Sequence, residues 1–407
     1  MEGIPLRKIA EIYGTPSFVY SENAISSAYQ AFDNAFSEHP HRICYSVKAN
    51  SNLALLQTLA LLGSGFDIVS GGELARVLKA GGDPSSVVFS GVGKQDWEIL
   101  FALKEKVGCF NVESYSELRK IAFLAKSKGD IAPISIRVNP DVDPNTHPYI
   151  ATGLKENKFG VSIDEALSLY QEAAMLDSLK ITGIDYHIGS QITEITPFID
   201  SLAKILSLVD TLHAQAITLE HIDIGGGIGV RYQDENPIEI NDFAVAIQKL
   251  MKGRSQSLLF EPGRFIVANA GVLLTKVTTL KETHEKNFAI VDAAMNDLIR
   301  PSLYNAWQEI TPVTMENKDN VPEKKWDIVG PICETGDFLG KDRVLALEEG
   351  QTLAILSSGA YGFVMSSNYN SRPRAAEILI SGERHYCVRK RESIRDLFAL
   401  ESMRPAY

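Results

Sequence analysis

The chain has 407 residues, which is enough for two domains, and its 45% hydrophobic and 22% charged residues are typical of a folded globular protein. Its formal net charge of -11 argues against nucleic acid or an anionic membrane as the main partner, because both would be repelled. The start of the chain lacks a secretory signal pattern, and no segment approaches the roughly 20 apolar residues of a membrane span, so we expect a cytoplasmic protein. The four cysteines are scattered without ligand-like spacing, so we expect neither disulfides nor structural zinc.

From about residue 40 to residue 262, short β-branched or aromatic runs alternate with longer segments of helical periodicity, as in repeated β/α units. Eight runs are expected to form parallel strands: residues 43–47, 65–69, 87–90, 109–113, 134–138, 181–187, 221–224 and 258–261. Crossover helices are expected between them, at residues 72–80, 114–128, 163–175 and 198–212. Eight such strands favour a closed (β/α)8 barrel of the TIM type, while an open doubly wound sheet would give the same periodicity.

Each predicted strand is followed at its C-terminal end by a polar or glycine-containing group. These groups are Lys48 with Asn50, Asp67 with Ser70, Ser90, Glu113, Arg137 with Asn139, His187 with Ser190, the glycine run at 225–227, and residues 261–264. A (β/α)8 barrel gathers such strand ends into one mouth, where its active site is built. The distribution of polar residues therefore favours the barrel over the open sheet.

After Arg264 the pattern changes to short strand-like runs separated by glycine or charged turns, which predicts a mostly β second domain, a sandwich or barrel. The runs are residues 272–277, 288–291, 326–329, 353–356, 377–380 and 385–388. The first 24 residues are expected to join this domain, because chain ends often pack together. The predicted domains are thus 25–268 for the barrel, and 1–24 with 269–407 for the β domain.

Lys48 ends a buried run, and its amine could form a Schiff base with a carbonyl compound if its surroundings favour the neutral form; a solvated lysine is the alternative. The glycine run at 225–227 and the turn at 261–264 follow the seventh and eighth strands, the usual phosphate cradle of such barrels. Val230 stands where G-x-G-x-x-G needs its third glycine, so a Rossmann nucleotide site is disfavoured. A strand-end lysine beside a phosphate site points to pyridoxal 5'-phosphate.

Other barrel residues could complete such a cofactor site. Glu261 could keep the pyridine nitrogen protonated and so strengthen the ring as an electron sink. His187 could stack on the ring, or be a satisfied core histidine, and Ser190 could add a hydroxyl. Asp67 could orient Lys48 or cap the helix that starts near Gly71, and the cap is the favoured interpretation.

The β domain offers candidates for substrate recognition. Arg300 and Tyr304 could bind a carboxylate, with a surface salt bridge as the alternative for the arginine. Cys333 could donate a proton and Glu334 could hold a substrate ammonium group, unless the cysteine is buried and inert. Tyr361 could bind phosphate or be a packed tyrosine.

Six motifs occur in an order that resembles the fold-type III pyridoxal phosphate decarboxylases over nearly the whole chain: YSVKAN at 45–50, HIGSQ at 187–191, GGG at 225–227, EPGR at 261–264, CE at 333–334 and GAY at 359–361. Within that family, residues 295–304 resemble the substrate-binding segment of the diaminopimelate decarboxylases. The resemblance implies decarboxylation of meso-2,6-diaminopimelate to L-lysine and a head-to-tail homodimer with shared active sites.

The same resemblance implies roles for individual residues. Lys48 and Cys333 are the implied catalytic residues. The implied cofactor-binding residues are Lys48, Asp67, His187, Ser190, Gly226, Gly227, Glu261, Pro262, Gly263, Arg264 and Tyr361. The implied substrate-binding residues are Arg264, Arg300, Tyr304, Tyr361 and Glu334, with Glu334 and Cys333 supplied by the partner subunit.

Three alternatives remain at this point. A related enzyme could decarboxylate ornithine, arginine or carboxynorspermidine, and an inactive relative could keep the fold to regulate a partner. A metal-dependent barrel enzyme is disfavoured, because His147 and His187 are the only histidines near strand ends and too few carboxylates are expected beside them. We therefore predict no metal site.

Overall fold

The computed structural model describes residues 1–143, 158–314 and 321–405. Most of residues 140–158, including His147, lie outside these ranges. The chain divides into two compact units: a barrel unit of residues 26–230 and 235–266, and a β unit of residues 1–25, 231–234 and 267–407. In the described parts, no helix combines the length and apolar character needed to cross a membrane.

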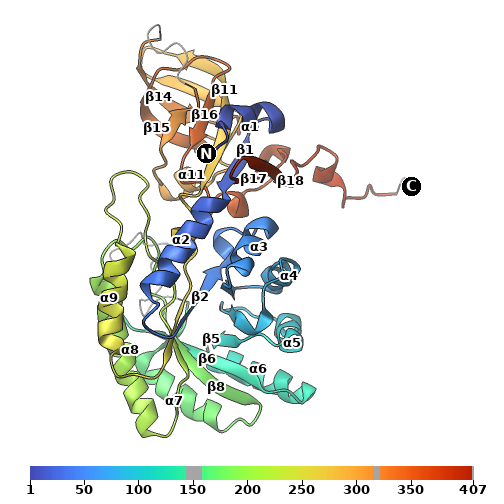
Figure 1. Cartoon of the computed structure of the whole chain (residues 1–407). Coiled ribbons are helices and arrows are strands. Elements are labelled where there is room, and N and C mark those ends of the chain that lie inside the picture. Colours follow the sequence, from blue (N-terminus) through green and yellow to red (C-terminus); the bar gives the residue numbers. More distant parts are fainter. Residues whose placement is uncertain (144–157, 315–320, 406–407) are drawn as a thin grey trace. The chain divides into compact units, whose positions relative to one another are not determined.

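Eight parallel strands form a closed barrel (Figure 1). In sequence order they are β2 (His41–Ser46), β3 (Gly65–Ile68), β4 (Val87–Phe89), β5 (Cys109–Val112), β6 (Ala132–Asn139), β8 (Leu179–Asp185), β9 (His221–Asp223) and β10 (Ser257–Phe260). Each strand pairs with the next, and β10 pairs with β2, so the sheet has no free edge. The predicted barrel is confirmed, and the open doubly wound sheet is wrong.

Helices cover the outside of these strands. They are α2 (Glu22–Ala35), α3 (Leu53–Leu61), α4 (Gly71–Lys79), α5 (Asp96–Glu105), α6 (Tyr115–Lys128), α7 (Ile163–Ala174), α8 (Thr196–Ala214), α9 (Ile240–Met251) and the short α10 (Arg264–Val267). A two-residue strand, β7 (Val161–Ser162), pairs with the end of β6. Serine residues begin several of them: the Ser114 hydroxyl accepts the Glu117 N–H group at the start of α6, and Ser162 does the same for Glu165 in α7. These caps satisfy N–H groups that the first turn of a helix leaves without partners.

Aromatic side chains pack β10 against the helices around it. The Phe36 and Phe260 rings are 4.3 Å apart, and Phe243 contacts Phe36 at 5.8 Å and Phe198 at 5.0 Å, both edge to face. Burial of such large apolar groups supplies the main free energy that holds the helices on the barrel. The mouth of the barrel can therefore carry polar residues without supporting the fold by itself.

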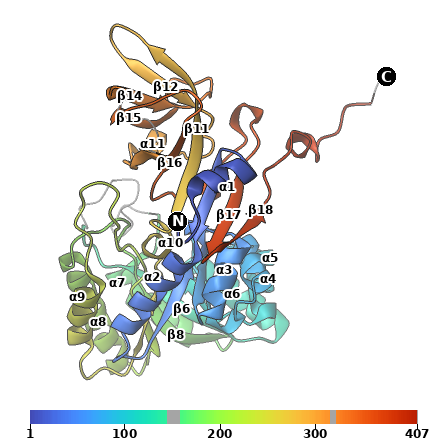
Figure 2. The ribbon, with the colours of Figure 1, turned by 45° about the horizontal axis from the view of Figure 1, so that its top comes forward.

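The β unit contains one sheet in which the long strand β11 pairs with three others, β1, β12 and β16 (Figure 2). Its elements are α1 (Leu6–Tyr13), β1 (Ser17–Ser21), β11 (Gly271–Glu282), β12 (Asn287–Val291), α11 (Arg300–Tyr304), β13 (Ile310–Pro312), β14 (Lys324–Val329), β15 (Phe338–Leu345), β16 (Thr352–Ile355), β17 (Ala376–Ser381) and β18 (Arg384–Arg389). The N-terminal strand β1 pairs antiparallel with β11 and parallel with β17. Strands β13 and β15 were not predicted, because β13 has three residues and β15 is interrupted by charged residues.

Candidate active site

Lys48 lies at the mouth of the barrel, in a 3₁₀ turn directly after β2. Its Nζ is 2.5 Å from Asp67 Oδ2, and its side chain is 39% exposed while that of Asp67 is fully buried. The Ser46 hydroxyl also contacts Asp67 Oδ2, at 2.8 Å. A buried carboxylate therefore holds an amine that ligands can still reach, and the alternative of a merely solvated lysine is wrong.

The favoured interpretation of Asp67 as a helix cap is also wrong. The Ser70 hydroxyl caps α4 by accepting the Glu73 N–H group at 3.2 Å. Asp67 lies within β3, three residues before that cap, and its carboxylate contacts Lys48 and Ser46. Ser70, which immediately precedes the helix, makes the cap, and the Asp67 carboxylate is therefore available to bind the Lys48 amine.

The glycine loop after β9 packs tightly between two neighbouring strand ends. A Cβ atom on Gly226 would lie 2.2 Å from the backbone oxygen of Glu261, so no other residue fits there. The Gly226 N–H group donates to His187 Nδ1 at 3.2 Å. Loss of solvent, followed by the charges of Arg137 and Lys48, lowers the pKa of His187 well below its usual value. His187 is therefore a neutral imidazole with its proton on Nε2.

The turn after β10 lies beside the Lys48 turn and ends in a cationic side chain. The Pro262 carbonyl accepts the Ser46 N–H group at 3.2 Å, and a Cβ atom on Gly263 would lie 2.8 Å from that of Ala49. Arg264, which begins α10, donates from Nη2 to the Ser190 hydroxyl at 2.8 Å. A guanidinium group, a hydroxyl and nearby glycine N–H groups form a set of donors suited to a phosphate.

Glu261 is buried at the end of β10, where its Oε1 accepts the Ser90 hydroxyl at 3.3 Å. Burial, then the charges of Asp223, Asp67 and Asp185, raises the pKa of Glu261 well above its usual value, and Lys48 offsets this in part. The carboxylate form thus needs a further cation next to it. A protonated pyridine nitrogen is such a cation.

Three carboxyl groups, two of which were not among the predicted site residues, meet at the barrel mouth. Asp185, Asp223 and Glu261 each place one oxygen within 4.8 Å of the other two. Arg137 lies 3.8 Å from Asp185 and 3.8 Å from Glu113, so the protein supplies positive charge of its own. Carboxylate oxygens at this spacing also occur in metal sites, but acidic groups alone do not define a metal site. The absence of a metal therefore stays a prediction.

In the β unit, Arg300 is buried at the start of α11, so the alternative of a surface salt bridge is wrong. Its guanidinium carbon lies 5.1 Å from the ring centre of Tyr232 and 5.9 Å from that of Tyr304. Two aromatic rings thus lie within cation–π distance of a buried guanidinium group, which suits it to bind a carboxylate.

The other candidates of the β unit lie on turns. Cys333 is exposed, so the alternative of a buried, inert thiol is wrong, and its N–H group donates to Asn370 at 2.8 Å. A hydrogen bond from Tyr369 to Glu334 raises the pKa of that tyrosine. Tyr361 is half-buried and has a φ angle of 55° in the turn after Gly359.

Several residues of these sites were missed in the sequence. Asp185 and Asp223 are the last residues of their strands, two positions before His187 and Gly225, and that position was the available signal. Asp337 accepts the N–H groups of Met295 and Ile332 at 2.7 and 2.9 Å, which ties the predicted substrate segment to the turn that carries Cys333. No sequence pattern indicates that contact.

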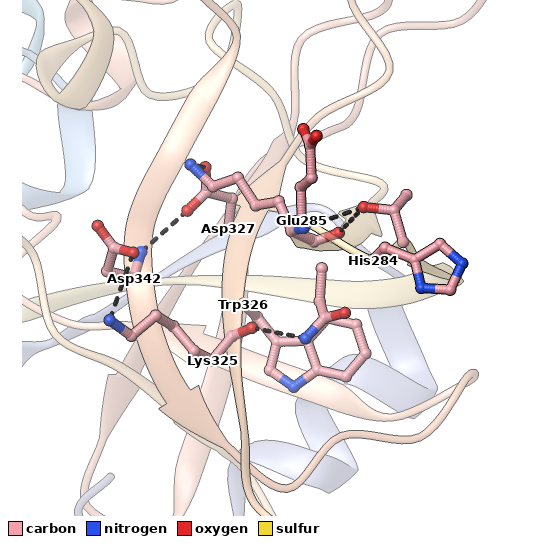
Figure 3. A pocket seen from close by; sticks show the side chains of 9 residues that line it. His284, Glu285, Lys325, Trp326, Asp327 and Asp342 are labelled. Carbon is pink, nitrogen blue, oxygen red and sulfur yellow. Dashed lines mark hydrogen bonds and ion pairs between the residues drawn. The ribbon is translucent and has the colours of Figure 1, made fainter.

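A cavity of about 470 Å³ lies elsewhere in the β unit and contains none of the predicted site residues (Figure 3). It is lined by the turn at 283–287, by residues 325–327 and by Asp342. Its charges pair with each other, Lys286 with Asp327 at 2.6 Å and Lys325 with Asp342 at 3.8 Å. The cavity therefore offers little net charge to a ligand.

The barrel mouth combines a reachable amine, an anion-binding turn, a neutral imidazole and a buried carboxyl group that requires a cation. This donor set fits the aldehyde, phosphate, ring face and ring nitrogen of pyridoxal phosphate, respectively. The fold and site together are those of a barrel enzyme that uses this cofactor.

Comparison with known proteins identifies the family of pyridoxal phosphate enzymes to which the chain belongs. Residues 22–268 match the family model described as the pyridoxal binding domain of pyridoxal-dependent decarboxylases. Diaminopimelate decarboxylases of Pseudomonas aeruginosa and Vibrio cholerae are 57% and 56% identical to this chain, covering 99% of it and 97% and 96% of their own lengths. The crystal structure of diaminopimelate decarboxylase from Helicobacter pylori with L-lysine has a TM-score of 0.94 at 44% identity, covering 97% of this chain and 99% of that one. The chain belongs to the pyridoxal-dependent decarboxylases and, within them, to the diaminopimelate decarboxylase family.

Replacing Glu261 by Gln tests its role at the ring nitrogen. We expect kcat to fall by about 10²–10³-fold, because a neutral amide does not stabilise a cationic ring. The cofactor should still attach to Lys48 and colour the protein, which separates loss of chemistry from loss of cofactor. Glu172→Gln is the matched control, since Glu172 pairs with Arg119 on the surface. A kcat for Glu261→Gln equal to that of the control would contradict this assignment.

Proposed function

We propose that this chain decarboxylates meso-2,6-diaminopimelate to L-lysine and carbon dioxide, the last step of lysine biosynthesis. The observation that carries the proposal is the 57% identity to a diaminopimelate decarboxylase across 99% of the chain, together with Lys48 and Glu261 at one barrel mouth. We also expect a cytoplasmic location, which cell fractionation would test.

Pyridoxal phosphate, when bound, supplies a ring that accepts the electron pair left behind by the departing carboxylate. Lys48 holds the cofactor through its amine, and Asp67 keeps that amine in place. Glu261 keeps the ring nitrogen protonated, while neutral His187 lies against the ring without adding charge. Ser190, Arg264 and the Gly227 N–H group bind the phosphate.

The substrate has two amino-acid ends, and the β unit supplies groups for the end that does not react. Arg300 and Tyr304 bind the distal carboxylate, and Glu334 binds the distal ammonium group. At the reacting carbon, the bond to the carboxylate breaks, carbon dioxide leaves, and the thiol proton of Cys333 goes to that carbon. The product is therefore lysine.

Turnover of four substrates tests this function. We expect kcat/KM for meso-2,6-diaminopimelate to exceed that for ornithine, arginine or carboxynorspermidine by about 10⁴-fold, because those compounds lack the distal carboxylate that Arg300 is proposed to bind. Arg300→Ala should lower kcat/KM for diaminopimelate by about 10²–10³-fold, and Arg7→Ala, which removes an exposed arginine of the same unit, serves as control. Preference for another substrate would overturn the proposal, and a colourless protein that stays inactive with added cofactor would favour a regulatory role.

We further propose that two chains form a head-to-tail dimer in which Cys333 and Glu334 complete the partner's active site. The barrel unit has no suitable thiol of its own among its described residues: Cys44 and Cys109 are buried, and burial raises the pKa of Cys44 well above its usual value and that of Cys109 to about 12. The barrel unit thus offers no accessible thiol within its described residues, whereas Cys333 is exposed.

Mixed dimers test the shared site. Lys48→Ala and Cys333→Ala chains with different affinity tags are co-expressed, and the heterodimer is purified. Because one of its two sites would regain both residues, we expect about half of the wild-type activity, whereas each parent homodimer should be nearly inactive. A heterodimer as inactive as its parents would show that each site is built from one chain.

A further inference from the structure

Asp223 occupies a position between two parts of the cofactor site. It is the last residue of β9, and its Oδ1 accepts the Gly225 N–H group at 2.9 Å. The Gly225 carbonyl in turn accepts the Glu261 N–H group at 2.8 Å. One buried carboxyl group therefore orients the start of the glycine loop, and that loop contacts the backbone of the residue proposed to face the ring nitrogen.

The other carboxyl groups around Asp223 have positive or polar partners. Asp67 pairs with Lys48 at 2.5 Å, and Asp185 lies 3.8 Å from Arg137. Glu113 also lies 3.8 Å from Arg137, and it accepts the N–H groups of Gly91 and Gly160.

Asp223 lacks such compensation. Within the described ranges, its Oδ2 has no hydrogen-bond partner, and no cation forms an ion pair with it. The charged and titratable groups that interact with it come from six other strands of the barrel or their ends: Cys44 from β2, Asp67 from β3, Cys109 from β5, Arg137 from β6, Asp185 and Tyr186 from β8 and its end, and Glu261 after β10. Most of these groups are acidic, and an ionised Asp223 would repel them.

We propose that Asp223 is a positioning residue whose carboxyl group stays protonated, so that it holds the glycine loop without placing a second negative charge beside Glu261. Burial is the largest cause that raises the pKa of Asp223 well above its usual value, and the charge of Asp185 adds to it. The single negative charge needed opposite a cationic ring then belongs to Glu261. This inference rests on the proposed cofactor site, but the protonation of Asp223 can be measured without any turnover.

Infrared spectroscopy of the purified holoenzyme tests the protonation state. Protein labelled with ¹³C-aspartate is recorded at about pH 8, one unit above the pKa of about 7 that burial gives Asp185, so that Asp185 is mostly ionised. We expect a label-shifted carbonyl band of a protonated carboxylic acid in the wild type, and its loss in Asp223→Asn. Asp185→Asn is the matched control and should keep the band. Equal bands in the wild type and Asp223→Asn would overturn the proposal.

Cofactor dissociation tests the positioning role. The amide oxygen of Asn can still accept the Gly225 N–H group, whereas Ala cannot, so Asp223→Ala should bind pyridoxal phosphate about 5-fold more weakly than Asp223→Asn. The thermal transition of each variant, followed by circular dichroism, verifies that it is folded before affinity is compared. If Ala binds as tightly as Asn, the contact with Gly225 has no positioning role. If Asp223→Asn binds pyridoxal phosphate much more weakly than the wild type does, a charged Asp223 is required and the proposal fails.

Discussion

Closure of the parallel sheet is the constraint on which the rest of the structure depends. Pairing of β5 with β6 and of β10 with β2 leaves no open edge, so the carboxyl ends of all eight strands surround one mouth. Lys48, Asp67, His187 and Glu261 come from four different strand ends and are far apart in the sequence, so strand pairing around the barrel is what places them at one mouth. The side chains that perform the chemistry can be polar because the aromatic and aliphatic packing under the helices stabilises the barrel independently.

Electrostatics at this mouth follow from burial. Carboxyl groups removed from water favour their neutral form unless a cation lies beside them, and the protein distributes its cations unevenly. Lys48 forms an ion pair with Asp67, and Arg137 lies 3.8 Å from both Asp185 and Glu113. Glu261 is left with a raised pKa and no cation among its hydrogen-bond partners in the described chain. Such a residue favours a cationic ligand, which is the property that a pyridoxal phosphate site needs.

Much of this fold could be predicted from the sequence, because eight strand-like runs with polar ends are a strong pattern. Strands β13 and β15 could not, since a three-residue strand has no periodicity and charged residues interrupt β15. The role of Asp67 was misjudged because a cap is a local feature, whereas its contact with Lys48 spans 19 positions and depends on pairing between β2 and β3. Asp223 and Asp337 were missed for the same reason: each acts through neighbours that only the folded chain brings together.

The central claim is that the Lys48 amine carries the cofactor at the barrel mouth. The most direct measurement compares Lys48→Ala with Lys104→Ala, whose side chain is 79% exposed, in visible absorption after borohydride reduction and in carbon dioxide release from diaminopimelate. The account predicts that Lys104→Ala resembles the wild type, while Lys48→Ala is colourless, has no cofactor fixed by borohydride and releases no carbon dioxide above background. A Lys48→Ala protein that keeps both its yellow colour and its carbon dioxide release would contradict it.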